Sequence, residues 1–359
     1  MASLFDPISF AHGRGMKNRF MLAPLTNQQS NVDGTLHDDE YKWLTMRAEG
    51  GFGLTMTCAS HVLAIGQGFP GQLGCFGDDH LPGLTRLAEG IKKNDSLSIV
   101  QIHHAGRRSP KELIGGNPVS SGADESTGAT ELSTAEVETT VEAFIAAAVR
   151  AEKAGFEGVE LHGAHDYLLC QFLNPELNVR SDKYGGSLEN RSRPIFEIID
   201  GIRAHCGSDF HVAVRLSPER FGMVTADIVK VYERLVGEAK VDMVDMSLWD
   251  TFKLGIDEGF TDKHLIDVFA NIDRGNVRLA VAGKLYTARD MQRAIDAGAD
   301  IVAVGRAAIA NHDFPKKAQA DPDFTMREMP IPRADLRAEG LSERFIDYMG
   351  VFGNFAAKE

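Results

Sequence analysis

Short apolar runs alternate along the chain with longer stretches in which apolar side chains recur every three or four residues. Each run ends in glycine or a polar residue and has the length of a buried parallel strand, whereas the longer stretches have the period of a helix. The runs cover residues 20–24, 53–58, 98–103, 158–162, 212–216, 243–247, 277–282 and 301–305. The helical stretches cover residues 38–49, 84–93, 135–154, 188–205, 226–240, 262–272, 288–297 and 307–317.

This alternation predicts the α/β class and, more specifically, a closed (β/α)8 TIM barrel. An open doubly wound sheet is the alternative, but no glycine fingerprint follows the first predicted strand. Residues 66–71 match G-x-G-x-x-G, yet they lie beyond the second strand, contain Pro70 and open no helix, so we interpret them as a loop. A chain of 359 residues suits one barrel, and we predict a single domain, 1–359.

Two segments are longer than ordinary βα loops. Residues 105–132, after the third strand, are rich in Gly, Ser, Pro and Thr and are predicted to form a capping excursion over the barrel mouth. Residues 174–187 form the second long connection. A C-terminal extension, 319–359, ends in a short helical pattern. The sequence leaves open whether this extension packs on the barrel exterior or reaches an active site, in its own subunit or a neighbour's.

Composition narrows the functional classes. Hydrophobic residues make up 43% of the chain and charged residues 25%, which is typical of a globular protein with a large core. The net charge of −13 argues against a nucleic acid or an anionic membrane as partner and leaves a small-molecule substrate. No apolar run approaches the ~18 residues of a membrane span. The four cysteines are scattered without a C-x-x-C, as in a reducing compartment, so a cytoplasmic location is expected. Self-association is left open.

The segment after the fourth predicted strand carries the main chemical signal. His162 and His165 are three residues apart, so one helical turn would bring them side by side, and Tyr167 follows closely. Two N–H donors beside a weak acid could stabilise a negatively charged oxygen and deliver a proton near it. The histidines could instead be loop residues or metal ligands, and Tyr167 could be a core aromatic.

Polar residues at other strand ends should converge on the same pocket. Gln101 and Arg215 lie inside predicted strands, where a buried polar group needs a partner. Gly283-Lys284 and Gly305-Arg306 each end a strand with glycine, a base and then a helix, which suits a phosphate cradle. A phosphate-bearing cofactor with amide and cation partners favours FMN, with Gln101 at the ring edge, Arg215 near N1 and C2=O, and Thr26 on the opposite side.

These residues resemble the Old Yellow Enzyme family of FMN-dependent NADH:flavin oxidoreductases and ene-reductases. The resemblance covers roughly residues 5–318. It is carried by Ala23-Pro24-Leu25-Thr26, by Gln101-x-x-His104-Ala105-Gly106-Arg107, by His162-x-x-His165-x-Tyr167, by Phe172-Leu173-x-Pro175, by the run from Asn178 to Arg191, and by the two glycine-base turns.

The resemblance implies that FMN is held non-covalently and that NADH or NADPH is the direct reductant. His162 and His165 would hold the carbonyl oxygen of an α,β-unsaturated substrate, and Tyr167 would protonate the α-carbon after hydride transfer from flavin N5 to the β-carbon. The implied cofactor-binding residues are Pro24, Leu25, Thr26, Ala59, Gln101, Arg215, Gly283, Lys284, Gly305 and Arg306.

Some positions depart from the family pattern. One branch of the family has cysteine where this chain has Thr26, and often tyrosine where this chain has Gln28. The C-terminal segment also lacks a clear arginine finger for a neighbouring subunit. Substrate contacts typical of the cysteine branch are therefore not expected here.

Two other functions compete with an ene-reductase. A metal-dependent barrel hydrolase could use His103, His104, His162 and His165, although no H-x-H ends the first strand. A flavin-binding protein without ene-reductase activity is the other alternative, against which Tyr167 argues as a proton donor.

Overall fold

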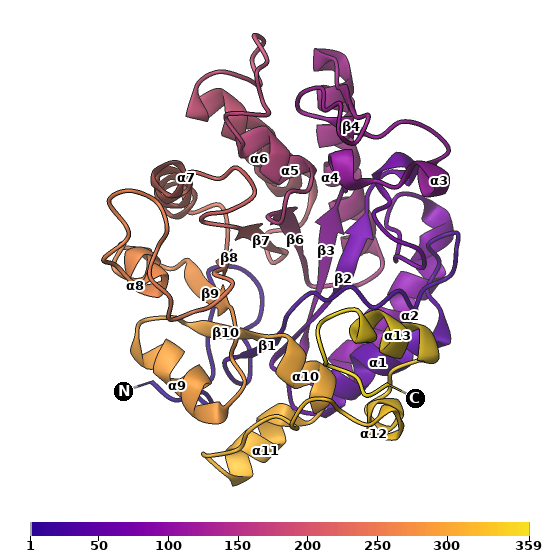
Figure 1. Ribbon diagram of the computed structural model, residues 1–359, viewed down its shortest axis with the longest axis vertical. Helices are drawn as coiled ribbons and strands as arrows, with labels where there is room; N and C mark the ends of the chain where they lie inside the picture. The colour runs from indigo at the N-terminus through magenta and orange to yellow at the C-terminus, as the bar shows by residue number, and fades with distance from the viewer. Residues whose placement is uncertain (1, 359) are drawn as a thin grey trace.

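The computed structural model describes residues 2–358 and contains a closed barrel of eight parallel strands, in the order β1-β10-β9-β8-β7-β6-β3-β2 (Figure 1). The barrel strands are β1 Phe20–Leu22, β2 Leu54–His61, β3 Leu97–His103, β6 Gly158–Gly163, β7 His211–Leu216, β8 Met243–Ser247, β9 Arg278–Ala282 and β10 Ile301–Val304. Closure comes from parallel pairing of the first and last strands, with Leu22 opposite Val304. The prediction of a (β/α)8 barrel is confirmed, and the open sheet is wrong.

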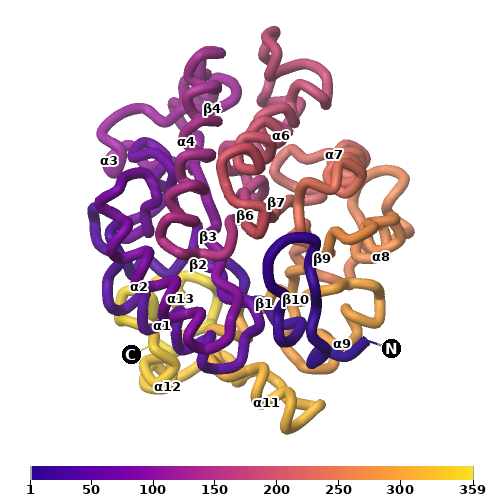
Figure 2. The backbone as a smooth tube through the Cα atoms, turned by 180° about the vertical axis from the view of Figure 1, so that it is seen from behind, coloured from indigo at the N-terminus to yellow at the C-terminus, as the bar shows by residue number. Residues whose placement is uncertain are grey.

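Helices surround the barrel on the outside (Figure 2). They are α1 Asp38–Glu49, α2 Leu81–Lys92, α4 Thr134–Lys153, α6 Leu188–His205, α7 Thr225–Glu238, α8 Leu265–Ala270, α9 Ala288–Asp296, α10 Arg306–Ala310 and α11 Phe314–Ala320. The stretch predicted as one helix at 307–317 is two helices. Pro315 explains the break, because proline disrupts a helix interior but is accepted in the first turn, where α11 places it.

The apolar core has an outer layer, between the strands and the helices, and a smaller inner layer within the barrel. Inward-facing residues of the inner layer include Met21, Met56 and Met243. Toward the carboxyl ends of the strands the buried interior becomes polar, with Gln101 on β3 and Arg215 on β7. Because apolar side chains fill the rest of the barrel interior, a ligand can bind only at the end where the polar side chains lie.

The predicted excursion at 105–132 has little regular structure. Its elements are the 3-10 turn Gly106–Arg108, α3 Lys111–Ile114, β4 Val119–Ser120 and β5 Thr130–Glu131, and β4 and β5 form a two-stranded sheet. The short helix α5, Leu168–Leu173, follows β6 and packs beneath this segment, because Gln171 donates to the carbonyl oxygen of Ala105 and accepts from the Ser120 hydroxyl.

The C-terminal extension folds back against the start of the chain. Its helices, α12 Arg333–Ala338 and α13 Glu343–Gly350, lie beside α1 in both views (Figures 1 and 2). Phe345 packs edge-on against Trp43, with ring centroids 5.4 Å apart. The buried guanidinium of Arg47 donates to the carbonyl oxygens of Glu339 and Ala308, which ties the extension to both α1 and α10.

Within residues 2–358, no helix is both long enough and apolar enough to cross a bilayer.

Candidate active site

His162 and His165 lie side by side, as the sequence predicts, but a helical turn does not bring them together. His162 is the penultimate residue of β6, and His165 lies in the turn that follows, with φ 61°. Their ring centroids are 5.1 Å apart and their planes are perpendicular, at 89°. The next residue, Asp166, also has a left-handed backbone, and Arg107 holds its carboxylate with Nη2–Oδ1 at 2.7 Å. This ion pair stabilises a turn that the residue spacing alone could not predict.

Hydrogen bonds set the orientation of both imidazoles. The backbone N–H of Ala164 donates to Nδ1 of His162 at 3.4 Å, which leaves the proton of a neutral ring on Nε2. Nε2 of His165 lies 2.7 Å from the Ser247 hydroxyl at the end of β8. The His162 ring therefore presents an N–H donor, while His165 is anchored to the neighbouring part of the barrel rim.

Burial keeps these histidines neutral. It lowers the pKa of His162 well below the usual value, and neighbouring His165, His103 and Arg215 lower it further. Burial likewise lowers the pKa of His165, assisted by the charges of Arg215 and Arg108. Neutral imidazoles can donate to a substrate oxygen without adding full charges to the pocket.

Tyr167 completes a tight aromatic group. Its ring centroid lies 5.0 Å from that of His162 and 4.3 Å from that of His103. Burial raises the pKa of the phenol, and the charge of Arg108 opposes that rise. The Arg108 guanidinium lies over the Tyr167 ring at 4.7 Å and donates to the backbone oxygen of His165. Arg108, which belongs to the excursion, is not among the residues predicted for the site.

A cavity of about 340 Å³ lies at the same end of the barrel, although His162, His165 and Tyr167 are not among its lining residues. Its lining includes Leu25, Arg215, Gly283, Lys284, Gly305 and Arg306 from the predicted cofactor set, together with Ser247, Trp249 and Tyr286. The bond between Ser247 and His165 joins the cavity to the histidine pair. Pro24, Thr26, Ala59 and Gln101 are not among the lining residues. Ala59 and Gln101 are paired in register on β2 and β3, and Pro24 and Thr26 flank Leu25.

The two glycine-base turns fit a phosphate. A Cβ at Gly283 would lie 2.8 Å from the backbone nitrogen of Asp250, so the chain passes too closely there for a side chain. A Cβ at Gly305 would meet only Leu25, at 3.7 Å, which leaves the backbone open to a ligand. The Lys284 ammonium lies 3.1 Å from Asp250, and Arg306 donates to the Tyr286 hydroxyl. Two cations beside an open glycine backbone suit the phosphate of FMN.

A layer of buried polar groups lies deeper in the barrel. Gln101 donates to Glu160 at 2.8 Å, and Arg215 Nε lies 3.0 Å from an Asp245 oxygen. Glu160 and Asp245 were not predicted as site residues. Glu160 could have been predicted from the sequence, because it lies two residues before His162 on β6 and its side chain therefore faces the same side of the strand.

The C-terminal extension reaches the barrel mouth of its own chain, which answers the question left open by the sequence. Burial raises the pKa of Tyr348 in α13, and a hydrogen bond with Thr26 opposes that rise. The charges of Tyr167 and Arg108 also act on this phenol. Tyr348 therefore lies near Thr26, Tyr167 and Arg108, and no sequence spacing could have placed it there.

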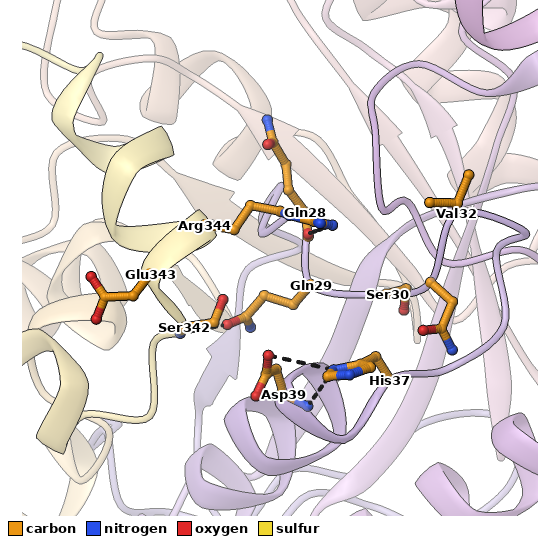
Figure 3. A pocket seen from close by; sticks show the side chains of 10 residues that line it. Gln28, Gln29, Ser30, Val32, His37, Asp39, Ser342, Glu343 and Arg344 are labelled. Atoms are coloured by element: carbon orange, nitrogen blue, oxygen red, sulfur yellow. Dashed lines mark hydrogen bonds and ion pairs between the residues drawn. The ribbon is translucent and has the colours of Figure 1, made fainter.

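A polar cleft of about 350 Å³ marks the seam where α13 docks (Figure 3). The backbone N–H of Ser342 donates to the Gln29 side chain at 2.8 Å, and Arg344 donates to the backbone oxygen of Gln28 at 3.2 Å. Figure 3 shows Arg344 extended toward Gln28 across this seam. These two hydrogen bonds fix α13 on the segment that follows Thr26, and they therefore help to place Tyr348.

A metal centre gains no support from the side chains in residues 2–358. No group of three His, Cys, Asp or Glu residues among them could hold a metal ion. Nδ1 of His104 accepts the backbone N–H of Gly106 at 3.0 Å, and burial lowers the His104 pKa to about 3. We therefore interpret His104 as a structural residue of the turn after β3.

Comparisons with known proteins agree with this geometry. Residues 3–323 match the model of the NADH:flavin oxidoreductase / NADH oxidase family. The "Probable NADH-dependent flavin oxidoreductase YqiG" of Bacillus subtilis is 33% identical over 330 residues, 88% of this chain and 87% of that protein. An NADPH dehydrogenase of Bacillus cytotoxicus is 32% identical, over 94% of this chain and 97% of its own length. The structure of an old yellow enzyme homologue from Zymomonas mobilis superposes with a TM-score of 0.80 at 26% identity, covering 96% of this chain and 99% of the other.

Proposed function

The chain belongs to the NADH:flavin oxidoreductase / NADH oxidase family, the Old Yellow Enzyme family, and from that membership we propose that it reduces the activated C=C bond of α,β-unsaturated carbonyl compounds. FMN is the cofactor, and NADH or NADPH is the reductant. Bound FMN supplies the redox chemistry, accepting a hydride from NAD(P)H and returning it to the substrate alkene.

The cofactor would be held by groups at the carboxyl ends of several strands. Lys284, Arg306 and the backbone at Gly305 would bind the phosphate, because they line one cavity and supply cations beside an open backbone. Arg215 and Gln101 would contact the ring from the barrel interior. Pro24, Leu25, Thr26 and Ala59 would complete the binding site from β1 and β2.

The two imidazoles would bind the carbonyl oxygen of the substrate. Because Nδ1 of His162 accepts a hydrogen bond, Nε2 of the neutral ring carries the proton and can donate it. His165 would exchange its bond with Ser247 for one with the substrate, or donate from its other nitrogen. Neutral donors aimed at this oxygen stabilise the negative charge that develops on it as hydride reaches the β-carbon.

Tyr167 would deliver the proton to the α-carbon. Its raised pKa keeps the phenol protonated at neutral pH, and its ring contacts the His162 imidazole. Arg108, over the face of the ring, stabilises the phenolate that proton transfer leaves behind, until solvent reprotonates it.

One observation carries this proposal. The neutral imidazole of His162 lies 5.1 Å from that of His165 and 5.0 Å from the protonated phenol of Tyr167, by ring centroids. His165 bonds to Ser247, which lines the same cavity as the predicted phosphate-binding residues. Hydride acceptance alone does not require a proton donor in this position, whereas reduction of an enone does.

Stopped-flow spectroscopy with the flavin-loaded protein tests the proposal. NADPH or NADH should bleach the flavin absorbance, and 2-cyclohexenone should restore it in a second anaerobic step. Bleaching without recovery across a panel of enones, nitroalkenes and quinones would contradict the proposal and favour a flavin protein without ene-reductase activity.

A further inference from the structure

Four buried polar side chains form a layer inside the barrel, and the proposed reaction gives two of them, Glu160 and Asp245, no task. Gln101, Glu160, Arg215 and Asp245 come from the neighbouring strands β3, β6, β7 and β8. Register pairs Gln101 with Glu160 and Arg215 with Asp245. The most exposed of the four, Arg215, has only 6% of its surface accessible. Burying a carboxylate this deeply costs stability unless the carboxylate is paired with a cation or a hydrogen-bond donor.

Each carboxyl holds one of the two groups proposed to contact the flavin ring. Glu160 Oε1 accepts from Nε2 of Gln101 at 2.8 Å, and Asp245 Oδ2 lies 3.0 Å from Nε of Arg215. Glu160 Oε2 and both carboxyl oxygens of Asp245 accept no hydrogen bond from the described residues, so Asp245 meets Arg215 as an ion pair only. One guanidinium and one amide cannot satisfy two buried carboxylates, so one of the two carboxyls retains a proton.

The charges around the pair support this protonation state. Burial raises the pKa of Glu160 to about 8, the charge of Asp245 raises it further, and Arg215 and Gln101 oppose the rise. Burial raises the pKa of Asp245, and Arg215 opposes it. The other titratable groups on which Arg215 acts are His162 and His165, which are held neutral. The net charge of this layer is therefore set by one guanidinium and by the protonation of two carboxyls.

We propose that Glu160 and Asp245 are positioning residues for the flavin, fixing the Gln101 amide and the Arg215 guanidinium, and that the protonation of these two carboxyls sets the charge that this layer presents to the cofactor. This inference rests on the cofactor placement in the proposed function. Hydride transfer from NAD(P)H adds one negative charge at the cofactor and releases NAD(P)+. In response, the carboxyl pair takes up one further proton from solvent wherever it is partly ionised, which balances the added charge beside Arg215.

Flavin affinity tests the positioning role. Glu160→Gln keeps an oxygen that can accept from Gln101, whereas Glu160→Leu removes it. Titration of each apoprotein with FMN, followed by flavin fluorescence, should give a Kd within about twofold of wild type for E160Q and roughly tenfold weaker for E160L. Equal Kd values for all three proteins would overturn the positioning role.

The pH dependence of the flavin midpoint potential tests whether the carboxyl pair takes up a proton when the flavin is reduced. Between about pH 5.5 and 9, wild type should take up more than one proton per electron pair over part of the range. E160Q, in which only Asp245 of the pair can still ionise, should take up fewer protons than wild type at the alkaline end of that range. Asp242→Asn is the matched control, because Asp242 is a buried carboxyl paired with Arg203 just before β8 begins. It should keep the wild-type profile. If the midpoint potential of E160Q depended on pH as that of wild type does, the proposed proton uptake by the carboxyl pair would be refuted.

Asp245→Asn provides a second route if E160Q folds poorly. It removes the counter-charge of Arg215 while keeping the shape of the side chain, so the potential should become less negative. An unchanged potential would also refute the proposal. Both readouts need only FMN and an electron donor, so failure of wild type to reduce any alkene would refute the proposed function and leave these results interpretable.

Discussion

The imidazoles and the phenol at the end of β6 are each held in an uncharged form by burial, and that state suits them to different tasks. His162 and His165 offer N–H groups to an oxygen, while Tyr167 retains a transferable proton. In the proposed reaction both tasks belong to the half-reaction that reduces the substrate, and neither belongs to the half-reaction that consumes NAD(P)H. Single substitutions should therefore separate the two half-reactions.

Tyr167→Phe should slow reoxidation by an enone roughly a hundredfold or more, because the proton donor is lost. Reduction of the flavin by NAD(P)H should stay within about twofold of wild type. Stopped-flow measurement of each half-reaction checks this. An unchanged reoxidation rate would mean that water or another group supplies the proton.

His162→Ala should weaken binding of phenolic ligands and slow enone reduction by roughly a hundredfold or more, because it removes one donor to the developing oxyanion. His162→Asn keeps an N–H donor and should recover part of the loss. Ligand titration by flavin absorbance and single-turnover kinetics measure the two effects. Equal losses in both half-reactions would contradict the assigned role.

At the scale of elements, the hydrophobic period predicted the barrel correctly because each strand and helix buries an apolar face of its own. Tertiary docking was not predictable in the same way. Tyr348 is carried by a helix that Ser342 and Arg344 bind to the segment after Thr26. The turn that places His165 depends on an ion pair between Arg107 and Asp166, which come from separate loops. Local pattern carries no information about such partners.

Arg47 should be the main anchor of the C-terminal extension. Its buried guanidinium donates to four backbone oxygens, and burial lowers its pKa to about 9. Arg47→Met leaves those oxygens unpaired and should lower the free energy of unfolding by about 3 kcal/mol. Denaturant titration measures the loss, and limited proteolysis should release the extension first.

Arg86→Met is the control for that experiment. Arg86 pairs with the exposed Asp38 on the same side of the barrel, and its loss should change stability by no more than about 0.5 kcal/mol. If the two variants proved equally stable, the extension would be held by its apolar contacts alone.

For the whole molecule, buried histidines and the buried acid pair make stability depend on pH in opposite directions. Burial holds the pKa of His103 well below 6.5 in the folded state. Protons therefore bind the unfolded chain as pH falls through about 6.5, and stability decreases. Glu160, with its pKa raised from 4.5 to about 8, binds its proton in the folded state first. It therefore adds stability as pH falls from 8 toward 4.5.

The two terms can be separated by substitution in the apoprotein. His103→Gln should make the acid loss of stability shallower than in wild type, whereas Glu160→Gln should make it steeper. Denaturant titrations between about pH 5 and 8 test both slopes. Identical slopes in all three proteins would show that neither group titrates differently on folding.

The pairing of β1 with β10 has a consequence for how the protein is made. The two strands are separated in the sequence by almost the whole barrel, and they must pair before the barrel can close. Leu22, for example, can pair with Val304 only after the last strand has been synthesised. A ribosome that has synthesised all but the last strand carries a sheet with two open edges, and neither the turn at Gly305 nor Tyr348 yet exists. Binding of the flavin phosphate at the proposed site can thus follow only after the last strand of the barrel has been synthesised.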